Sequence, residues 1–293
     1  MTVFNLGSIN IDRFYSVPHL PSAGETLAAT AHWSGLGGKG ANQSLAAARG
    51  GARVVHIGAI GPDGDAVLAC LGDAGVNIEN VTRLEEHTGH AIISVDSTGE
   101  NAIVIFSSAN LKLTETQVST ALGAAKSGDF CLLQNETNLV SFAAELARNK
   151  GLSVVYSAAP FNCDRVKEVL SFIDLLVVNE VEAEQLAAAL GVTTANLPVA
   201  AVLVTRGAAG ATYRMGGEEI EVSAFAADPV DTTGAGDTYL GFLVAGFDAG
   251  MDVRGAMKFA SAAAAIQVGR QGTASAIPTL TEVRDFLKLR LTG

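Results

Sequence analysis

Residues 175–178 read Leu-Leu-Val-Val and residues 201–205 read Ala-Val-Leu-Val-Thr, with a helical pattern over residues 181–190 between them. Both runs are short, apolar and rich in valine and leucine, which is typical of strands buried in a parallel sheet. A strand, a helix and a second strand in this order make one unit of a parallel α/β fold.

The same alternation extends along most of the chain. Further buried strands are predicted at Val3–Ile9, Arg53–Ile57, Phe130–Gln134 and Ser153–Tyr156. Helices are predicted at Ala41–Arg49, Asp65–Ala74, Glu115–Lys126, Leu139–Asn149, Val181–Leu190, Ala235–Ala249, Val253–Val268 and Thr281–Leu289. We therefore expect an α/β fold with a central, mostly parallel sheet flanked by helices on both faces.

Two regions interrupt the alternation. Thr26–Trp33 and His90–Ile105 have the pattern of exposed or half-exposed strands. They predict a small β lid beside the main sheet, formed by segments about 13–34 and 88–107. The chain has no linker, low-complexity stretch or internal repeat, so residues 1–293 are expected to form one domain with a lid.

Composition and charge exclude several classes of protein. Hydrophobic residues make up 48% of the chain and charged residues 17%, which is a globular composition. The formal net charge is −11 and no cluster of lysine and arginine is visible, so a nucleic-acid partner is not expected. A single nucleotide remains possible, because backbone amides and one metal ion suffice to hold its phosphates.

Cysteine use and the chain ends indicate the compartment. Cys70, Cys131 and Cys163 are odd in number and widely spaced, as expected in a reducing environment. The N-terminus leads directly into a strand pattern without a secretory signal, and no apolar run of membrane-spanning length occurs. A cytoplasmic protein without a membrane partner is expected.

The first glycine-rich segment is Gly35-Leu36-Gly37-Gly38-Lys39-Gly40, before the helix from Ala41. It formally matches GxGxxG, but it follows a lid-like strand instead of the first strand of a βαβ unit, so dinucleotide binding is not indicated. Lys39 precedes Gly40 and not Ser or Thr, which excludes a Walker A loop. A turn that presents Lys39 and Asn42 remains, and it suits a ligand site and a plain helix start equally.

The second segment, Thr205-Arg206-Gly207-Ala208-Ala209-Gly210, follows a predicted strand. Loops at the carboxyl ends of parallel strands are where α/β proteins bind ligands. An ordinary turn between two strands explains the same residues, and on this segment alone it is the slightly better explanation.

The third segment, Asp231-Thr232-Thr233-Gly234-Ala235-Gly236-Asp237, opens a predicted helix. Free amides at a helix start bind anions, and glycine lets a phosphate come close. An acid in the first turn also favours the helix dipole, but that does not account for two acids that bracket a glycine-rich turn. Phosphoryl transfer needs such donors together with a carboxylate that accepts the hydroxyl proton.

Taken together, these residues resemble the ribokinase family of carbohydrate kinases. Residues 231–237 match its DTxGAGD-type motif, Gly37–Gln43 match its GGKGANQ-type motif, and Gly7–Asp12 resemble its opening. The motifs stand in the family's order, and the resemblance continues through most of the chain.

The resemblance implies roles for individual residues. Asp237 would be the catalytic base, and the sugar hydroxyls would be bound by Asn10, Asp12, Gly38, Lys39, Asn42, Glu136 and Asp237. Nucleotide binding would fall to Asn179, Thr205, Gly207, Gly210, Gly234, Ala235, Gly236 and Ser261. Asn179 and Glu182 match a motif near magnesium, although the same spacing is that of a helix capping box and both explanations stay open. A monovalent cation would lie at Asp231, Thr233, Gln267, Arg270, Gly272 and Ala276.

The implied activity is transfer of the γ-phosphoryl group of ATP to a sugar hydroxyl, with D-ribose and its O5 as the first choice. Mg²⁺ would accompany ATP, K⁺ would activate, and the lid would form the contact of a homodimer. The alternatives are a kinase for another pentose, for fructose or for a nucleoside, and a sugar- or nucleotide-binding regulator without catalysis. Ala276 stands where the family more usually has serine, and residues 157–160 also depart from its pattern.

Overall fold

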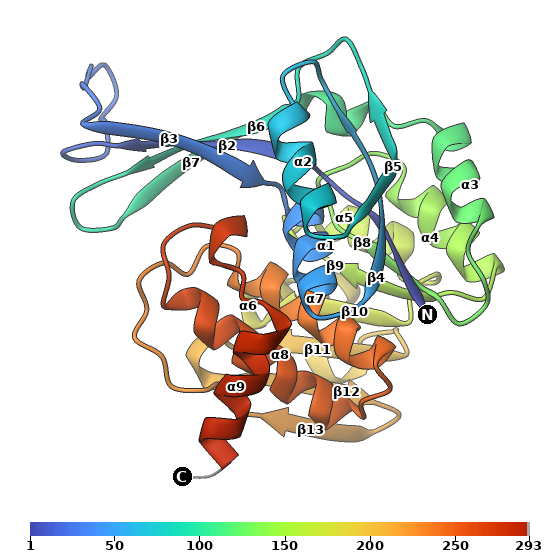
Figure 1. Ribbon diagram of the computed structural model, residues 1–293. Helices are drawn as coiled ribbons and strands as arrows, with labels where there is room; N and C mark the ends of the chain where they lie inside the picture. Colours follow the sequence, from blue (N-terminus) through green and yellow to red (C-terminus); the bar gives the residue numbers. More distant parts are fainter. Residues whose placement is uncertain (292–293) are drawn as a thin grey trace.

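The fold is built on two β-sheets, one of which carries all the helices (Figure 1). It was obtained as a computed structural model, and the structure describes residues 1–291. The main sheet has nine strands in the order β13-β12-β11-β10-β9-β8-β1-β4-β5. The second sheet has four, in the order β3-β2-β6-β7, and projects from the body as a separate arm, drawn in blue to teal at the left of Figure 1.

The strands of the main sheet are short. They are β1 (Thr2–Leu6), β4 (Arg53–Ile60), β5 (Asn77–Arg83), β8 (Phe130–Leu133), β9 (Ser153–Ser157), β10 (Leu175–Asn179), β11 (Ala201–Thr205), β12 (Ala211–Met215) and β13 (Glu218–Val222). All neighbours from β11 to β5 pair in parallel, and β12 and β13 add an antiparallel edge. The sheet is therefore mostly parallel, as the sequence predicted.

Helices cover both faces of this sheet. They are α1 (Lys39–Arg49), α2 (Asp65–Asp73), α3 (Glu115–Gly123), α4 (Val140–Asn149), α5 (Cys163–Val169), α6 (Glu180–Leu190), α7 (Ala235–Asp248), α8 (Val253–Val268) and α9 (Leu280–Leu291). Strand β8 shows how the two layers arise: Leu132 belongs to the apolar core under α1, α2, α7 and α8, whereas Cys131 and Leu133 belong to the core under α3 to α6. Successive residues of a strand point to opposite faces, so an unbroken apolar run serves both cores.

Helices α1 and α7 lie unusually close together, and this contact positions the site described below. A β-carbon added at Gly241 would come within 2.4 Å of the Ala46 side chain and 2.8 Å of the Gln43 carbonyl oxygen. Atoms of α1 already occupy the space that a side chain at Gly241 would need, so no larger residue fits there without moving one helix. The starts of the two helices are thereby brought to the same edge of the sheet.

The chain changes sheets between Leu6 and Asn10, and the prediction of one strand over Val3–Ile9 is wrong at this point. Strand β1 ends at Leu6, and β2 (Asn10–Ser16) begins the lid sheet, which continues with β3 (Ala31–Gly37), β6 (Gly89–Val95) and β7 (Asn101–Phe106). A β-carbon on Gly7 would lie 2.4 Å from the Gly40 Cα, so the chain turns here against the start of α1. This packing is invisible in the local pattern.

The prediction of a strand over Thr26–Trp33 is also wrong in its bounds, since β3 begins only at Ala31. Residues before it form a loop in which His19 Nε2 and Glu25 Oε1 are 2.8 Å apart. The sequence missed α5, β5 and the β12–β13 hairpin, which are short or largely polar on one side. It placed β11 and α8 with the bounds that the structure has, and the other predicted helices with ends shifted by up to a few residues.

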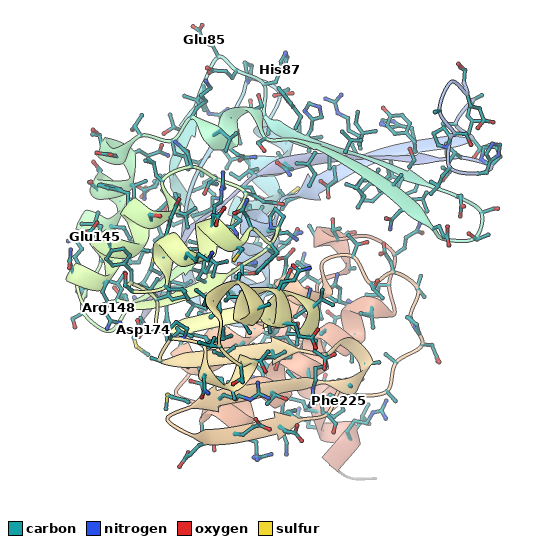
Figure 2. All side chains as sticks on the ribbon, turned by 180° about the vertical axis from the view of Figure 1, so that it is seen from behind. Glu85, His87, Glu145, Arg148, Asp174 and Phe225 are labelled. Carbon is teal, nitrogen blue, oxygen red and sulfur yellow. The ribbon has the colours of Figure 1, made fainter. Side chains whose placement is uncertain are left out.

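The lid sheet has a small apolar cluster on one face and an apolar edge strand. Phe14, Ala91 and Ile93 are buried with Trp33 and Val95 packed against them, and the Phe14 and Trp33 rings stack with centroids 5.1 Å apart. Strand β7 leaves Ile103, Val104, Ile105 and Phe106 exposed, and Figure 2 shows its side chains standing out from the arm. Among the helices of residues 1–291, none combines the length and apolar character needed to cross a bilayer.

Candidate active site

The loops that follow β1, β8, β10 and β11 gather at one edge of the main sheet. These are the carboxyl ends of parallel strands, where α/β proteins place their ligands. The starts of α1 and α7 meet at the same edge. Most of the residues that the sequence marked for binding come together here, from segments that are far apart in the sequence.

Helix α7 begins without a capping side chain. Its first residue follows Gly234, which has the left-handed φ of 78°. Its first-turn amides have no intrahelical acceptors, as in every α-helix, and among the described residues no side chain caps them. The Ala235 amide makes one long contact of 3.3 Å with the Thr232 carbonyl. The helix start is therefore free to donate to an anion.

The carboxylate of Asp237 is buried in that first turn. Gln43 Nε2 donates to Asp237 Oδ1 at 2.8 Å, and Asn42 Nδ2 makes a longer contact of 3.4 Å with Oδ2. Asn42 Oδ1 is buried without a hydrogen-bond partner among the described residues. One carboxylate oxygen is thus firmly held, and the other, beside an unpaired amide oxygen, is left for a ligand.

Acidic groups and one lysine surround Asp237. Burial, with the nearby charge of Glu136, raises the pKa of Asp12 to about 7. The carboxylate of Asp237, followed in effect by that of Glu136, raises the pKa of Lys39 above its ordinary value. The lysine is therefore a permanent cation close to the carboxyl groups of Asp237, Glu136, Glu182 and Asp12.

Glu136 is fixed by two donors. Ser8 Oγ donates to Glu136 Oε2 at 2.5 Å, and the Lys39 backbone amide donates to the same oxygen at 2.9 Å. The second contact requires the turn at Gly38, whose φ of 89° is in the region that favours glycine. The acid after β8 is thereby tied to the start of α1.

Asn10 is oriented by Asn110, a residue to which the sequence gave no role. Asn110 Nδ2 donates to Asn10 Oδ1 at 2.8 Å, and Asn110 Oδ1 accepts from the Ile9 amide at 2.9 Å. A β-carbon on Gly89 would collide with this pair at 2.1 Å and 2.4 Å. Thr273, also missed, reaches Asp12 Oδ2 at 3.5 Å. Buried polar residues in short loops were the only available signal for either residue.

A cavity of about 670 Å³ adjoins the start of α7. Its lining joins the Thr205–Gly210 loop with the first residues of α7 and with α8, and it includes Thr205, Gly207, Gly210, Ala235, Gly236 and Ser261. Phe225, labelled in Figure 2, is one of the residues that line it. The volume and the mostly apolar lining suit a nucleotide base and ribose.

Two hydroxyl groups that line this cavity are weakly satisfied. Ser261 Oγ and Tyr239 Oη are buried and lie close enough to interact with each other, but neither makes a well-formed hydrogen bond among the described residues. Burial raises the pKa of Tyr239 well above its ordinary value, so its hydroxyl stays protonated. The sequence marked Ser261 and missed Tyr239, which its helical pattern did not distinguish from a core residue.

Asn179 and Glu182 form a complete capping box at the start of α6. Asn179 Oδ1 accepts from the Glu182 amide, and Glu182 Oε2 accepts from the Asn179 amide, both at 2.9 Å. The structural explanation of this pair is thus confirmed. Asn179 is paired with Thr205 across β10 and β11. The charge of Glu182 acts on Lys39, so this carboxylate lies near the site, and only its Oε2 takes part in the capping box.

Several of the residues predicted to bind a monovalent cation are connected to one another by hydrogen bonds. Asp231 accepts from the Thr233 amide at 2.9 Å and from the Gly272 amide at 3.1 Å. Gln267 Nε2 donates to the Thr233 carbonyl at 2.7 Å, and Gln267 Oε1 is buried without a partner among the described residues. An orphaned amide oxygen beside a carboxylate is the kind of donor set that a cation completes.

Arg270 and Ala276 take part in that loop differently. The Arg270 side chain points to α9, where it donates to Glu282 Oε1 at 2.6 Å and, with other hydrogen bonds, lowers the pKa of Glu282 to about 2. Only its backbone is left for a ligand. Ala276 donates its amide to the Thr273 carbonyl at 3.1 Å, so it closes the loop without offering a side-chain ligand.

The sequence and the fold are similar to those of known carbohydrate kinases. Residues 2–280 match the pfkB family of carbohydrate kinases. The chain is 37% identical to a ribokinase of Haemophilus influenzae, over 98% of both chains, and 31% identical to a deoxyribokinase of Salmonella typhi, over 99% of both. The solved structure of an Arabidopsis thaliana ribokinase complexed with ribose and ATP superimposes with a TM-score of 0.85 at 29% identity, covering 98% of each chain.

Proposed function

This chain belongs to the pfkB family of carbohydrate kinases, and we propose that it transfers the γ-phosphoryl group of ATP to O5 of D-ribose, giving D-ribose 5-phosphate and ADP. The observation that carries this proposal is the buried Asp237 carboxylate in the first turn of an uncapped helix, between the base-sized cavity and the polar cluster of Asp12, Lys39 and Glu136.

The reaction follows from that placement. The bond between the sugar oxygen and the γ-phosphorus forms as the bond from that phosphorus to the bridging oxygen of ADP breaks. Asp237 Oδ2 takes the hydroxyl proton as the transfer proceeds. The amides of Gly234, Ala235 and Gly236 donate to the phosphoryl oxygens as their charge redistributes, and Lys39 adds a positive charge on the same side.

Sugar recognition would use the polar groups on the other side of Asp237. Asn10 and Asp12 come from the lid strand β2, Glu136 from the loop after β8, and Gly38, Lys39 and Asn42 from the start of α1. Carboxylates and amides accept and donate hydrogen bonds to a polyol, and Asn42 Oδ1, which has no partner among the described residues, is an available acceptor. A sugar that lacks one of the matching hydroxyls would leave buried groups unpaired.

On the nucleotide side, Thr205, Gly207, Gly210 and Ser261 would line the base and ribose, with Asn179 beside the phosphates. Mg²⁺ would be held near Asn179 and Glu182, because one oxygen of Glu182 is unengaged in the capping box. When bound, this ion neutralises charge on the β- and γ-phosphates. The capping box keeps the Glu182 carboxylate in place for it.

A monovalent cation, K⁺ by preference, would bind near Asp231, Thr233, Gln267, Gly272 and the backbone of Arg270 and Ala276. Support comes from the unpaired Gln267 Oε1 and from the position of this loop directly before the Gly234–Gly236 amides. A cation there would order the loop and, through it, the helix start, without touching the sugar. Turnover in K⁺ should exceed turnover in a bulky organic-cation buffer.

The exposed apolar side chains on both faces of the edge strand β7 support a homodimer formed through the lid. Ile103, Val104, Ile105 and Phe106 would be covered by the same strands of a second copy. Light scattering at micromolar concentration should give twice the mass of the chain, whereas a monomeric mass would contradict this. We also propose one working unit over residues 1–293 and a cytoplasmic location, supported by the use of ATP and by three free cysteines.

The substrate is tested with purified protein, ATP, Mg²⁺ and a panel of pentoses, hexoses and nucleosides. D-ribose should give the highest kcat/KM. A much higher value for 2-deoxyribose, fructose or a nucleoside would reject the ribose assignment and leave the kinase reaction in place. Binding of sugar and ATP without phosphoryl transfer to any of them would indicate a non-catalytic regulator.

A further inference from the structure

A chain of buried polar side chains leads away from Asp237 and is not part of any binding surface described above. It runs through Gln43, Gln134, Asn5, Ser44 and His56, all of which are fully or almost fully buried. Its links are Gln43 to Asp237 at 2.8 Å, Gln134 to Gln43 at 2.7 Å, Gln134 to Asn5 at 2.9 Å, Asn5 to Ser44 at 2.8 Å and Ser44 to His56 at 2.8 Å. It joins the first turn of α7 to strand β4 through α1, the residue that follows β8, and β1.

The two ends of this chain are acceptors, which fixes the direction of every hydrogen bond in it. At the far end, His56 Nε2 lies 3.1 Å from the Gly7 carbonyl, which only accepts. Burial lowers the pKa of His56 to about 4, so the ring is neutral and its proton is on Nε2. Nδ1 is then an acceptor, and the Ser44 hydroxyl donates to it. At the near end, the Asp237 carboxylate accepts from Gln43.

Gln134 donates hydrogen bonds to both of its neighbours in this chain of side chains. Its Nε2 gives one hydrogen to Gln43 Oε1 and the other to Asn5 Oδ1. Its own Oε1 is buried without a partner among the described residues. Turning this amide around would place Oε1 between two other acceptor oxygens, which is worse than one unpaired oxygen. Gln134 therefore obliges Gln43 to present its NH₂ group, and not its carbonyl, to Asp237.

We propose that Gln43 is a positioning residue for the catalytic base, and that Gln134 sets the orientation in which it works. Gln43 holds Asp237 Oδ1 at 2.8 Å, so the carboxylate cannot rotate and Oδ2 stays directed at the substrate. This inference rests on the proposed function, in which Asp237 accepts the hydroxyl proton. Apolar residues would fill the same space at lower desolvation cost, so a packing role alone does not account for five connected polar side chains.

The test uses Gln43→Met, which keeps the length of the side chain and removes the donor. The full-length protein is assayed for kcat and for KM of D-ribose and ATP, with its Tm measured in parallel. We expect kcat to fall by about 10- to 100-fold, the loss typical of a reacting group displaced by about 1 Å, with both KM values within about threefold. A kcat within twofold of the parent, or a rise in KM that matches the fall in kcat/KM, would overturn the proposal.

Gln117→Met is the matched control. Gln117 Nε2 donates to two backbone carbonyls, of Gly58 at 2.7 Å and Asn80 at 2.9 Å, and it lies on α3, on the opposite face of the sheet from α1 and α7. It loses as many hydrogen bonds as Gln43→Met does. Its Tm should fall while kcat stays within twofold. If the control loses as much kcat as Gln43→Met, the effect is one of general stability and the proposal is wrong.

Gln134→Glu tests the orientation without touching Gln43. An ionised Glu at this position accepts where the amide donated, so Gln43 would turn its carbonyl toward Asp237. We expect kcat to fall at least as far as in Gln43→Met, again with little change in KM. A fully active Gln134→Glu enzyme would contradict the proposed role of Gln134. This variant also serves if Gln43→Met does not fold.

The double variant separates this inference from the proposed function. If Gln43 acts only through Asp237, adding Gln43→Met to Asp237→Asn should cause less than a twofold further loss of kcat. Normal turnover in Asp237→Asn alone would defeat the proposed function. Slow turnover in Asp237→Asn with normal turnover in Gln43→Met would defeat only the positioning role. A further loss that multiplies with the first would show that Gln43 acts by another route.

Discussion

Two helices of this protein, α6 and α7, begin at the same edge of the main sheet. They differ in whether a side chain accepts hydrogen bonds from the free backbone amides of their first turn. Helix α6 satisfies its own start, since Asn179 and Glu182 exchange hydrogen bonds in a capping box on the surface. Helix α7 starts at Gly234 with a left-handed φ and, in the part of the chain that the structure describes, without a capping side chain. The capped start can stabilise the fold alone, whereas the uncapped start needs a ligand to complete it.

The surroundings differ in the same sense. The α6 cap is exposed, so water solvates whatever it leaves unpaired. The α7 start borders a buried cluster in which Lys39 stands among Asp12, Glu136 and Asp237. The start of α6 has the stabilising hydrogen bonds of a cap and the start of α7 lacks them. The candidate catalytic residue Asp237 lies at the less stabilised start.

The largest effect is expected at the acid of the uncapped start. Asp237→Asn keeps the size of the side chain and removes the base, so kcat should fall by about 10²- to 10⁴-fold. Binding of a non-hydrolysable ATP analogue, measured by calorimetry, should change little, because the α7 amides are retained. If Asp237 served only the helix dipole, the variant would lose under about 1 kcal/mol of stability and keep near-normal turnover.

The glycine of the uncapped start comes next. Gly234→Ala forces a β-carbon into a φ of 78° and should shift the amides that follow, lowering kcat by at least about tenfold. Gly191 ends α6 at a φ of 67° with open space around it, so Gly191→Ala carries a similar backbone penalty away from the site. Equal losses of kcat in the two variants would show that α7 needs only stability and not a particular start.

The buried charges beside the uncapped start predict a dependence on pH. Because the pKa of Asp12 is raised to about 7, the free enzyme carries its ionised form mainly above that pH. If ionised Asp12 accepts sugar hydroxyls, KM for the sugar should fall by about five- to tenfold as pH rises from about 6 to 8. Asp12→Asn should abolish this pH dependence, and a parallel dependence in that variant would assign it to another group.

The same shift has a consequence for folding. A carboxyl whose folded pKa lies above its unfolded value of 3.8 holds a proton that the unfolded chain has already released, so the ligand-free protein should lose stability as pH rises from about 4 to 7. Asp12→Asn removes this loss and should raise Tm near neutral pH while it weakens sugar binding. A lower Tm for Asp12→Asn than for the parent at pH 7.5 would contradict the conclusion that the ionised Asp12 carboxylate destabilises the ligand-free protein.

The smallest effects are expected at the capped start. Glu182→Ala breaks the capping box and should cost about 1 kcal/mol of unfolding free energy. Glu182→Gln preserves the box and removes the charge, so stability should change by under about 0.5 kcal/mol while the Mg²⁺ concentration for half-maximal rate rises several-fold. An unchanged Mg²⁺ requirement in this variant would leave Glu182 as a cap alone.

Local sequence was sufficient for most of the helices, for several strands of the main sheet and for the two helix starts. Apolar runs of valine and leucine placed β10 and β11 to within a residue, and the helical pattern placed α8 with its observed bounds. The glycine-rich turn before Asp237 and the Asn179–Glu182 spacing each indicated how their helix begins. Such features depend on residues within one turn or one strand. Their periodicity and capping residues can therefore be recognised from neighbouring positions in the sequence.

Tertiary structure alone decided which of these elements meet. Gln43 reaches Asp237 across 194 positions because Gly241 lets α1 and α7 touch, and Asn110 orients Asn10 across 100 positions because Gly89 leaves room for it. The sheet change after Leu6 and the late start of β3 depend on the same packing. The pKa of Asp12 belongs to no segment, since it arises from burial and from the charge of Glu136 brought near by the fold.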